Sequence, residues 1–456
     1  MELSELQGEY DVIIAGTGLT ESLISGCLAQ SGKKLINFDK YLEYGGFLKT
    51  KGINDFITWV NEHGEFIVNR VEEKLGTNLR NGAYCFDIFP IAVFSRDKII
   101  QILINSKGFE SLTTYLIEGL FFRTKDSFRA IPSSKSSIFS EKSIPVRQKR
   151  AVMKFIAYFL PEEEYGHAID TEEIEQKVEE YKDKPFNELL KALNFDDDLA
   201  QAFEYFVALA RDPLLTKDAV PRIREFLNSF GRWGPTPFVE FSYGASESPQ
   251  LFARHSAVFG GIFILNHFPQ KIERDEDNDQ LILTVDGIGT IKTKTLVASS
   301  EHLESTGESK FIGYREVLLT SKRLLDSDRA VSVIAPNVMG NEKPVYIFQF
   351  DDDLRCCQEG QYVIHFSSMA PIRDVVDKIA SDIGEDDLIL RAAFTLTENI
   401  PKEIKGVYSV ISPSVEEVAF GTNYFIEAAE KYMKETFPDV EFYPKPTEVE
   451  IVVEEE

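Results

Sequence analysis

The chain has 456 residues, enough for two or three domains, and 43% of them are hydrophobic, which excludes wholesale disorder. A formal net charge of −26 repels nucleic-acid phosphates, so nucleic-acid binding is not expected. An acidic start, four cysteines and no apolar run of about 18 residues indicate a cytoplasmic protein with free thiols and no membrane span.

The first forty residues predict a strand–helix–strand unit. Residues 10–15 (YDVIIA) form a short apolar run typical of a strand buried on both faces. Gly16-Thr17-Gly18 ends that strand, helical spacing follows from Leu19 to Leu28, and residues 34–39 are predicted to form the second parallel strand. This is the start of a dinucleotide-binding, Rossmann-type domain.

The glycine turn nevertheless departs from the dinucleotide-binding pattern. Glu21 occupies the third glycine position, where a carboxylate at roughly 4–6 Å from phosphates costs on the order of 1–4 kcal/mol. Asp39 stands where a ribose-binding acid belongs, but no Arg flanks Gly45-Gly46 and no strand ends in Gly-Asp near the C-terminus. We therefore expect a flavoprotein scaffold without FAD or any other cofactor.

Further along, strands give way to helices and then return. Residues 86–95 predict one strand, residues 96–108 a helix, and residues 113–130 two more strands. Apolar residues at helical spacing then recur across residues 131–230. We expect an α/β large domain (1–130 and 231–443), an inserted all-helical domain (131–230) and an acidic tail (444–456).

The second part of the large domain is predicted to be rich in strands. A small antiparallel sheet is expected from residues 262–265, 280–285 and 290–297, and further strands from residues 331–335, 345–350 and 362–368. Helices are expected at residues 372–383 and 423–437.

Catalytic and metal-binding patterns are missing from the sequence. The six histidines include no pair at helical metal spacing, and neither Gly-x-Ser-x-Gly nor a P-loop occurs. Asp351-Asp352-Asp353 is either a solvated turn or a cation site, and Cys356-Cys357 are expected to be buried or loop thiols. We therefore predict no catalytic residues, no metal ligands and no enzyme activity.

Three long stretches in order carry a resemblance to a known family. They are residues 10–26 with 38–46, residues 132–155 ending in QKRAVMKF, and residues 231–261 from GRWGPTPF to FARHSAVFGG. They resemble the Rab GDP-dissociation inhibitor and Rab escort protein family. The resemblance implies a flavoprotein-like large domain that binds a Rab GTPase without using FAD, and a helical domain that shelters geranylgeranyl lipid.

The resemblance also implies individual contacts. Tyr44, Glu247 and Arg254 match the platform for the GTPase switch regions, although Glu247 and Arg254 could instead pair with each other. Further contacts implied for the Rab are Arg232 and Phe238, on a loop that is mobile in the family, and Ile264, where the family often has Met.

Lipid and tail sites follow from the same resemblance. The Rab tail should lie along residues 89–104, and the lipid should enter among Phe155, Phe159, Phe203 and Phe206, which core packing explains equally well.

The escort branch is favoured over the inhibitor branch. Residues 132–143 and 184–191 look more like escort proteins, and Phe186 matches a Phe that inserts into the α subunit of the Rab geranylgeranyltransferase α/β heterodimer, or else is a core residue at a helix start. Asp196-Asp197-Asp198 stands where a basic partner is expected, and a long escort insertion is missing.

Four functions therefore remain open. The first is an escort protein that presents unprenylated Rab to the transferase and delivers it to membranes by transient contact. The others are an inhibitor that extracts prenylated Rab, a flavin-dependent amine oxidase-like enzyme, and an interaction protein unrelated to Rab.

Overall fold

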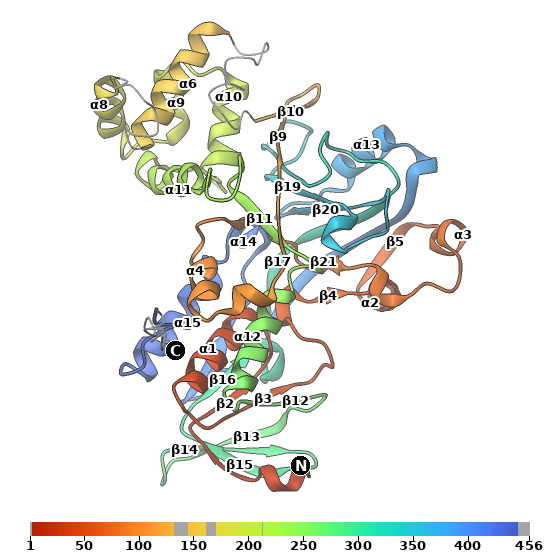
Figure 1. Cartoon of the computed structure of the whole chain (residues 1–456), viewed down its shortest axis with the longest axis vertical. Helices are drawn as coiled ribbons and strands as arrows, with labels where there is room; N and C mark the ends of the chain where they lie inside the picture. Colours follow the sequence, from red (N-terminus) through yellow and green to blue (C-terminus); the bar gives the residue numbers. More distant parts are fainter. Residues whose placement is uncertain (1, 132–144, 161–169, 212, 446–456) are drawn as a thin grey trace, which may run out of the picture.

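The computed structural model describes residues 2–131, 145–160, 170–211 and 213–445. Figure 1 shows an elongated molecule with a group of helices at one end, a large sheet in the middle, and a parallel sheet with a β-meander at the other end. The fold is mixed α/β with a Rossmann-type unit, as predicted.

The Rossmann-type unit is a five-stranded sheet in which every neighbouring pair is parallel. Its strands, in spatial order, are β12 (Ile262–Leu265), β3 (Leu35–Asp39), β2 (Val12–Ala15), β16 (Leu296–Ser299) and β22 (Val407–Val410). One face packs on α1 (Leu19–Gln30), α12 (Glu247–Val258) and α15 (Asn423–Thr436). The other face is covered by the meander β13 (Pro269–Asp275), β14 (Gln280–Val285) and β15 (Gly289–Thr293), extended by β1 (Gly8–Tyr10).

Two strand predictions in this unit are wrong. Residues 262–265 do not join the antiparallel sheet, because β12 pairs in parallel with β3 as the edge of the Rossmann-type sheet. Residues 290–297 are not one strand, since the Thr293 hydroxyl bonds to both the N–H and the C=O of Thr295 and bends the chain from β15 into β16.

An eight-stranded sheet forms the middle of the molecule. In spatial order it contains β10 (Phe128–Ala130), β9 (Gly119–Arg123), β18 (Ala330–Ile334), β19 (Val345–Phe350), β20 (Tyr362–Ser368), β17 (Ser305–Thr320), β21 (Leu388–Pro401) and β5 (Gly64–Asn69). α13 (Arg373–Ile383) covers one face, while α2 (Ile53–His63) and the helical group contribute to the apolar cluster on the other.

Short strands connect these layers. β11 (Phe238–Phe241) lies between β7 (Val93–Phe94) and β8 (Thr114–Leu116), and β4 (Thr50–Lys51) pairs with β6 (Phe86–Asp87). The strand predicted over residues 86–95 is therefore split in two, because Pro90 has no N–H to donate to a ladder. Residues 113–130 hold three strands rather than two. Small helices α3 (Val71–Leu75), α4 (Lys98–Asn105) and α14 (Val415–Val418) complete this part.

The described residues between 145 and 230 contain the helices α6 (Val146–Phe159), α8 (Glu172–Tyr181), α9 (Phe186–Ala192), α10 (Asp197–Gln201) and α11 (Thr216–Ser229). Between α10 and α11 the chain forms a π-helical turn, η5 (Ala202–Val207). None of the helices with described structure has the length and hydropathy of a membrane span.

Candidate functional site

The glycine turn of the Rossmann-type unit is filled by its own side chain. The Glu21 carboxyl folds back over the turn, since a Cβ placed on Gly18 would lie 2.6 Å from Glu21 Oε2 and one on Gly16 2.9 Å from Oε1. This position, at the N-terminus of α1, is where phosphates bind in dinucleotide-binding folds. Burial, together with the nearby acids Asp39 and Glu301, raises the pKa of Glu21 to about 8.

The second glycine turn also closes the phosphate site. Gly45 N–H donates to Thr17 O at 3.1 Å, and a Cβ on Gly46 would lie 2.9 Å from Gly18 Cα, so the two backbones touch. Asp39, the expected ribose acid, accepts a 2.6 Å hydrogen bond from the Thr17 hydroxyl instead. These residues do not fit the pyrophosphate of FAD, and we assign no chemistry to a cofactor here.

A corner of the molecule next to these turns gathers several predicted contact residues. A Cβ on Gly45 would lie 3.1 Å from Ser246 Cβ, so the Tyr44 turn packs against the start of α12. Glu247 and Arg254 lie two turns apart on one face of α12. In the described part of the chain no ion pair joins them, so the alternative that they neutralise each other is wrong. Burial raises the pKa of Glu247, while Arg254 is exposed.

β12 brings a different residue to this corner than predicted. Ile264 pairs in register with Phe38 and packs toward the meander, on the opposite face of the sheet from α12. Its neighbour Phe263 pairs with Asn37, and its ring lies 6.1 Å from that of Tyr44. Strand alternation read from the buried face could have identified Phe263 beforehand.

Exposed apolar side chains also lie on the segments that flank α12 at both of its ends. Of the ten large apolar residues that are exposed among those described, six belong to the turn after β3, the two ends of α12 or the segment after β12: Tyr41, Leu42, Tyr243, Val258, Phe259 and Phe268. Leu42 and Val258 are each 74% exposed. We call these six residues with Tyr44, Glu247, Arg254 and Phe263 the α12 corner (α12 and β12 are labelled in Figure 1).

The loop predicted to contribute Arg232 and Phe238 lies elsewhere, between α11 and β11. Arg232 donates to Ser95 O at 2.8 Å, and its guanidinium carbon lies 4.9 Å from the centre of the Trp233 ring. Phe238 is 0% exposed, packed against Phe94 and Phe420, so its prediction as a Rab contact is wrong for this conformation.

The other aromatic predictions also fall in the core. Phe186 is 0% exposed with its ring 6.4 Å from that of Phe155, so it is not presented for insertion into a transferase. Phe155 packs with Phe159 and Phe203 inside the helical group. Phe206 lies in the same apolar cluster as the other three, but its ring contacts are with Phe226, Phe238 and Phe420. Within residues 89–104, Phe89 is buried and Ile104 is 40% exposed.

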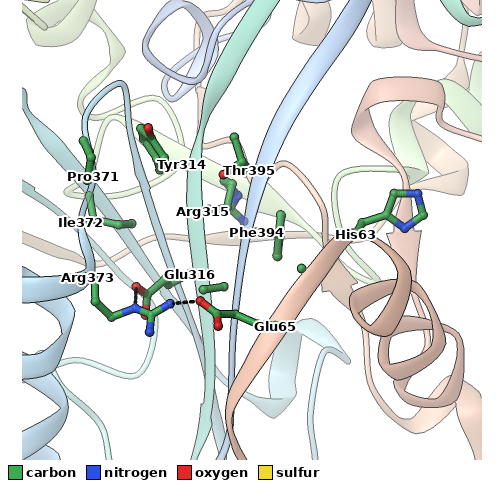
Figure 2. Close-up of a pocket in the computed structure, with 12 residues that line it drawn as sticks. His63, Glu65, Tyr314, Arg315, Glu316, Pro371, Ile372, Arg373, Phe394 and Thr395 are labelled. Carbon is green, nitrogen blue, oxygen red and sulfur yellow. Dashed lines mark hydrogen bonds and ion pairs between the residues drawn. The ribbon is translucent and has the colours of Figure 1, made fainter.

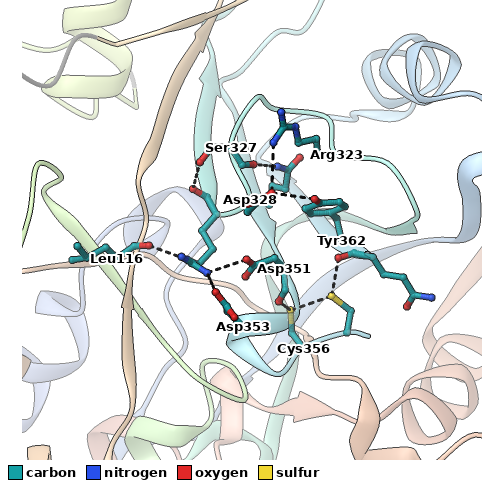
Figure 3. A network of polar contacts seen from close by, with 12 residues as sticks. Leu116, Arg323, Ser327, Asp328, Asp351, Asp353, Cys356 and Tyr362 are labelled. Atoms are coloured by element: carbon teal, nitrogen blue, oxygen red, sulfur yellow. Dashed lines mark hydrogen bonds and ion pairs between the residues drawn. The ribbon is translucent and has the colours of Figure 1, made fainter. Parts of the chain in front are cut away.

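Two polar features lie on the large sheet. A cleft of about 440 Å³ lies at the start of α13. There Arg373 bonds to Glu65 at 2.6 Å and to Glu316 at 3.1 Å, and Figure 2 shows these lining side chains. Arg329 donates to Asp351 at 2.9 Å and to Asp353 at 2.7 Å. Figure 3 shows Asp351 and Asp353 within this network of polar contacts. Arg329 thus neutralises part of the aspartate run, while the Asp353 side chain stays 58% exposed, which agrees with a solvated turn rather than a cation site.

The adjacent cysteines Cys356 and Cys357 lie in the interior of the protein. Their thiols donate to Asp351 O at 3.1 Å and Gln361 O at 3.2 Å, as expected for buried thiols. Within the described ranges, no three His, Cys, Asp or Glu side chains are grouped so as to hold a metal ion.

The chain is thus of the flavoprotein-type fold, with its phosphate site filled by its own residues and an exposed apolar corner beside it. It belongs to the GDP dissociation inhibitor family, whose model matches residues 6–413. A Rab proteins geranylgeranyltransferase component A from Drosophila melanogaster is 23% identical over all of this chain and 94% of that protein. A guanosine nucleotide diphosphate dissociation inhibitor from Arabidopsis thaliana is 27% identical over 79% of this chain and 80% of that protein.

Solved structures show the same fold. The Rab GDI of Plasmodium falciparum superposes with a TM-score of 0.74 at 16% identity, covering 95% of this chain and 99% of that one. A putrescine oxidase bound to putrescine superposes with a TM-score of 0.53 at 11% identity, covering 95% and 99%. The fold is therefore shared with oxidases, and a shared fold does not assign their activity to this chain.

Proposed function

We propose that this protein is a Rab escort protein. It binds an unprenylated Rab GTPase in its GDP form, presents it to the Rab geranylgeranyltransferase heterodimer and delivers the prenylated product to membranes. The α12 corner is the observation that carries the proposal, because exposed aromatic and aliphatic side chains beside an exposed Arg and a half-buried Glu suit a protein partner. The Drosophila relative named as a component of that transferase spans the entire chain.

The protein acts without catalysis of its own. The large domain, residues 1–130 and 231–443, binds the GTPase, and the helical domain, residues 131–230, takes up geranylgeranyl lipid during transient membrane contact. The filled glycine turn supports a role without flavin catalysis, since Glu21 and Gly46 occupy the space that a flavin nucleotide requires. The C-terminal tail from residue 446 and the escort-like residues 132–143 lie outside the described residues.

A Rab GDP-dissociation inhibitor is the alternative function. It is supported by the extent of the match to the Plasmodium falciparum Rab GDI. The burial of Phe186 also removes one argument for the escort branch. In this alternative the same corner binds Rab-GDP, but the bound GTPase already carries its lipid.

Reconstitution separates the two functions. Purified Rab, the transferase heterodimer and geranylgeranyl diphosphate are combined with and without this chain, and lipid transfer to Rab is followed. An escort protein makes the transfer dependent on the chain. If transfer proceeds equally well without it, while the chain strips prenylated Rab from liposomes, the protein is an inhibitor.

The α12 corner is tested by Arg254→Ala. Because Arg254 is exposed and makes no ion pair within the described chain, its loss should leave stability unchanged. It should weaken the affinity for GDP-loaded Rab by about 1–2 kcal/mol, measured by titration calorimetry. Arg323→Ala is the matched control, since this arginine pairs with Asp326 and Asp328 outside the α12 corner. Equal affinities of both variants would place the Rab surface elsewhere.

A further inference from the structure

The turn between β11 and α12 holds a residue in an unfavourable backbone conformation. Tyr243 has φ +67°, in the left-handed region that side chains with a Cβ avoid, and its ring is 50% exposed. Such conformations persist only where neighbouring groups impose them, and they gather at binding sites. A glycine would adopt this conformation without cost, so the turn itself does not require the tyrosine ring.

The buried side chain of Asp87 and the hydroxyl of Thr50 hold the turn in this conformation. Asp87 Oδ1 accepts a 3.0 Å bond from Ala245 N–H and a 2.5 Å bond from the Thr50 hydroxyl, whose oxygen accepts from Ser246 N–H at 3.2 Å. Asp87 is 3% exposed. Gly244, the residue after Tyr243, has φ +96° and lies against these two side chains. A Cβ at this position would collide with both the Asp87 carboxylate and the Thr50 hydroxyl.

The turn is also fixed on its other side. Tyr243 N–H donates to Leu354 O at 2.8 Å, which ties the turn to the loop after β19. Glu247, the first residue of α12, follows Tyr243 by four positions, and Ser246 contacts the Tyr44 turn. Groups from β4, β6 and the β19 loop therefore set where the Tyr243 ring stands relative to Tyr44 and Glu247.

We propose that Tyr243 is a contact residue for the bound GTPase and that Asp87 and Thr50 are positioning residues that hold its turn. This inference rests on the proposed function. The partner surface that suits Tyr243 is apolar with a hydrogen-bond acceptor at its edge, since the exposed ring offers an apolar face and a hydroxyl donor. A contact with a partner explains why Tyr243 keeps both a strained backbone and an exposed ring, since its ring does not pack into the core.

Tyr243→Gly tests the contact. Removing the ring relieves the left-handed strain, so the urea midpoint should stay equal or rise, while the affinity for a GDP-loaded Rab falls about tenfold. Asn337→Gly is the control, because Asn337 is also exposed with φ +66°, in the turn between β18 and β19. It should match Tyr243→Gly in stability and wild type in affinity.

The outcomes of this experiment are distinct. If wild type binds Rab and Tyr243→Gly binds equally well, the contact is refuted while the proposed function stands. If wild type binds no Rab, the proposed function fails and the contact fails with it.

Thr50→Val tests the positioning role. It keeps the side-chain shape but removes the hydroxyl, so amide hydrogen exchange should speed up at Ala245 and Ser246 and Rab affinity should fall, with Thr50→Ser restoring both. Thr422→Val is the control, because the Thr422 hydroxyl donates to the buried Asp97 at 2.7 Å away from this turn. Equal losses of Rab affinity in both Val variants, or unchanged exchange in Thr50→Val, would refute positioning.

Discussion

At the scale of single residues, the burial of Glu21 in the former phosphate site makes the stability of the fold depend on pH. Its pKa is about 8 in the folded protein, because burial disfavours the charged form, against 4.5 for an unperturbed glutamate. The folded state therefore binds this proton more tightly than the unfolded state. The contribution of Glu21 to the free energy of unfolding falls as pH rises from 4.5 to 8, by on the order of 4 kcal/mol.

Glu21→Gln should remove this pH dependence. The amide cannot ionise, so the variant is expected to be more stable than wild type at pH 8.5 and close to it at pH 5. Urea unfolding at several pH values measures the difference. The exposed Glu62→Gln serves as control and should parallel wild type. If the Glu21→Gln curve also parallels wild type, folding does not raise the pKa of Glu21 and its burial against the glycine turn is refuted.

How far single residues could be predicted depends on what fixes their side chains. The position of Glu21 against the glycine turn follows from spacing within one strand–helix unit, and that prediction is confirmed by its contacts. Phe186 and Phe238 are buried by residues distant in sequence, so no local pattern separates them from exposed contacts. Ile264 was predicted as a contact from its match to a family position, and such a match does not show which way a strand residue points; in the structure it packs toward the meander.

At the scale of elements, short strands made mostly of apolar residues were the most predictable. The bounds predicted for β14, β19 and β20 agree with the structure residue for residue, since each is a short apolar run. β17 and β21 were missed. One half of each strand extends into solvent with a mixed polar sequence, where neither an apolar run nor strict alternation appears.

Phe186→Ala distinguishes a core element from a docking element. Phe186 begins α9, is 0% exposed, and lies among Phe155 and other buried residues of the helical group. We expect the truncation to destabilise the protein by about 3–5 kcal/mol through cavity formation. Thermal unfolding gives the measure, with exposed Val146→Ala as control. A variant as stable as wild type that no longer recruits the transferase would restore the docking prediction.

At the scale of the whole molecule, the aromatic rings of the helical group make two sets of contacts, one within the group and one with the rest of the chain. Phe155, Phe159, Phe195 and Phe203 pack with one another inside the group. Phe206 and Phe226 instead contact Phe238 of β11, and Phe206 also contacts Phe420. These contacts join the helical group to the strands of the rest of the chain. On the proposed lipid site, we expect the rings around Phe155 to separate for the lipid while the contacts of Phe206 and Phe226 with Phe238 and Phe420 stay in place.

This division predicts opposite behaviour for two similar truncations. Phe203→Ala and Phe206→Ala each remove one buried ring and should each cost about 3–5 kcal/mol of stability. Only Phe203→Ala leaves its space among the rings around Phe155, where a prenyl chain gains up to about 0.8 kcal/mol for each CH₂ it buries. Its affinity for a fluorescent geranylgeranyl-cysteine peptide should therefore rise, while that of Phe206→Ala stays at the wild-type level. Equal lipid affinities in both variants would mean that the lipid enters somewhere other than the Phe155–Phe203 cluster.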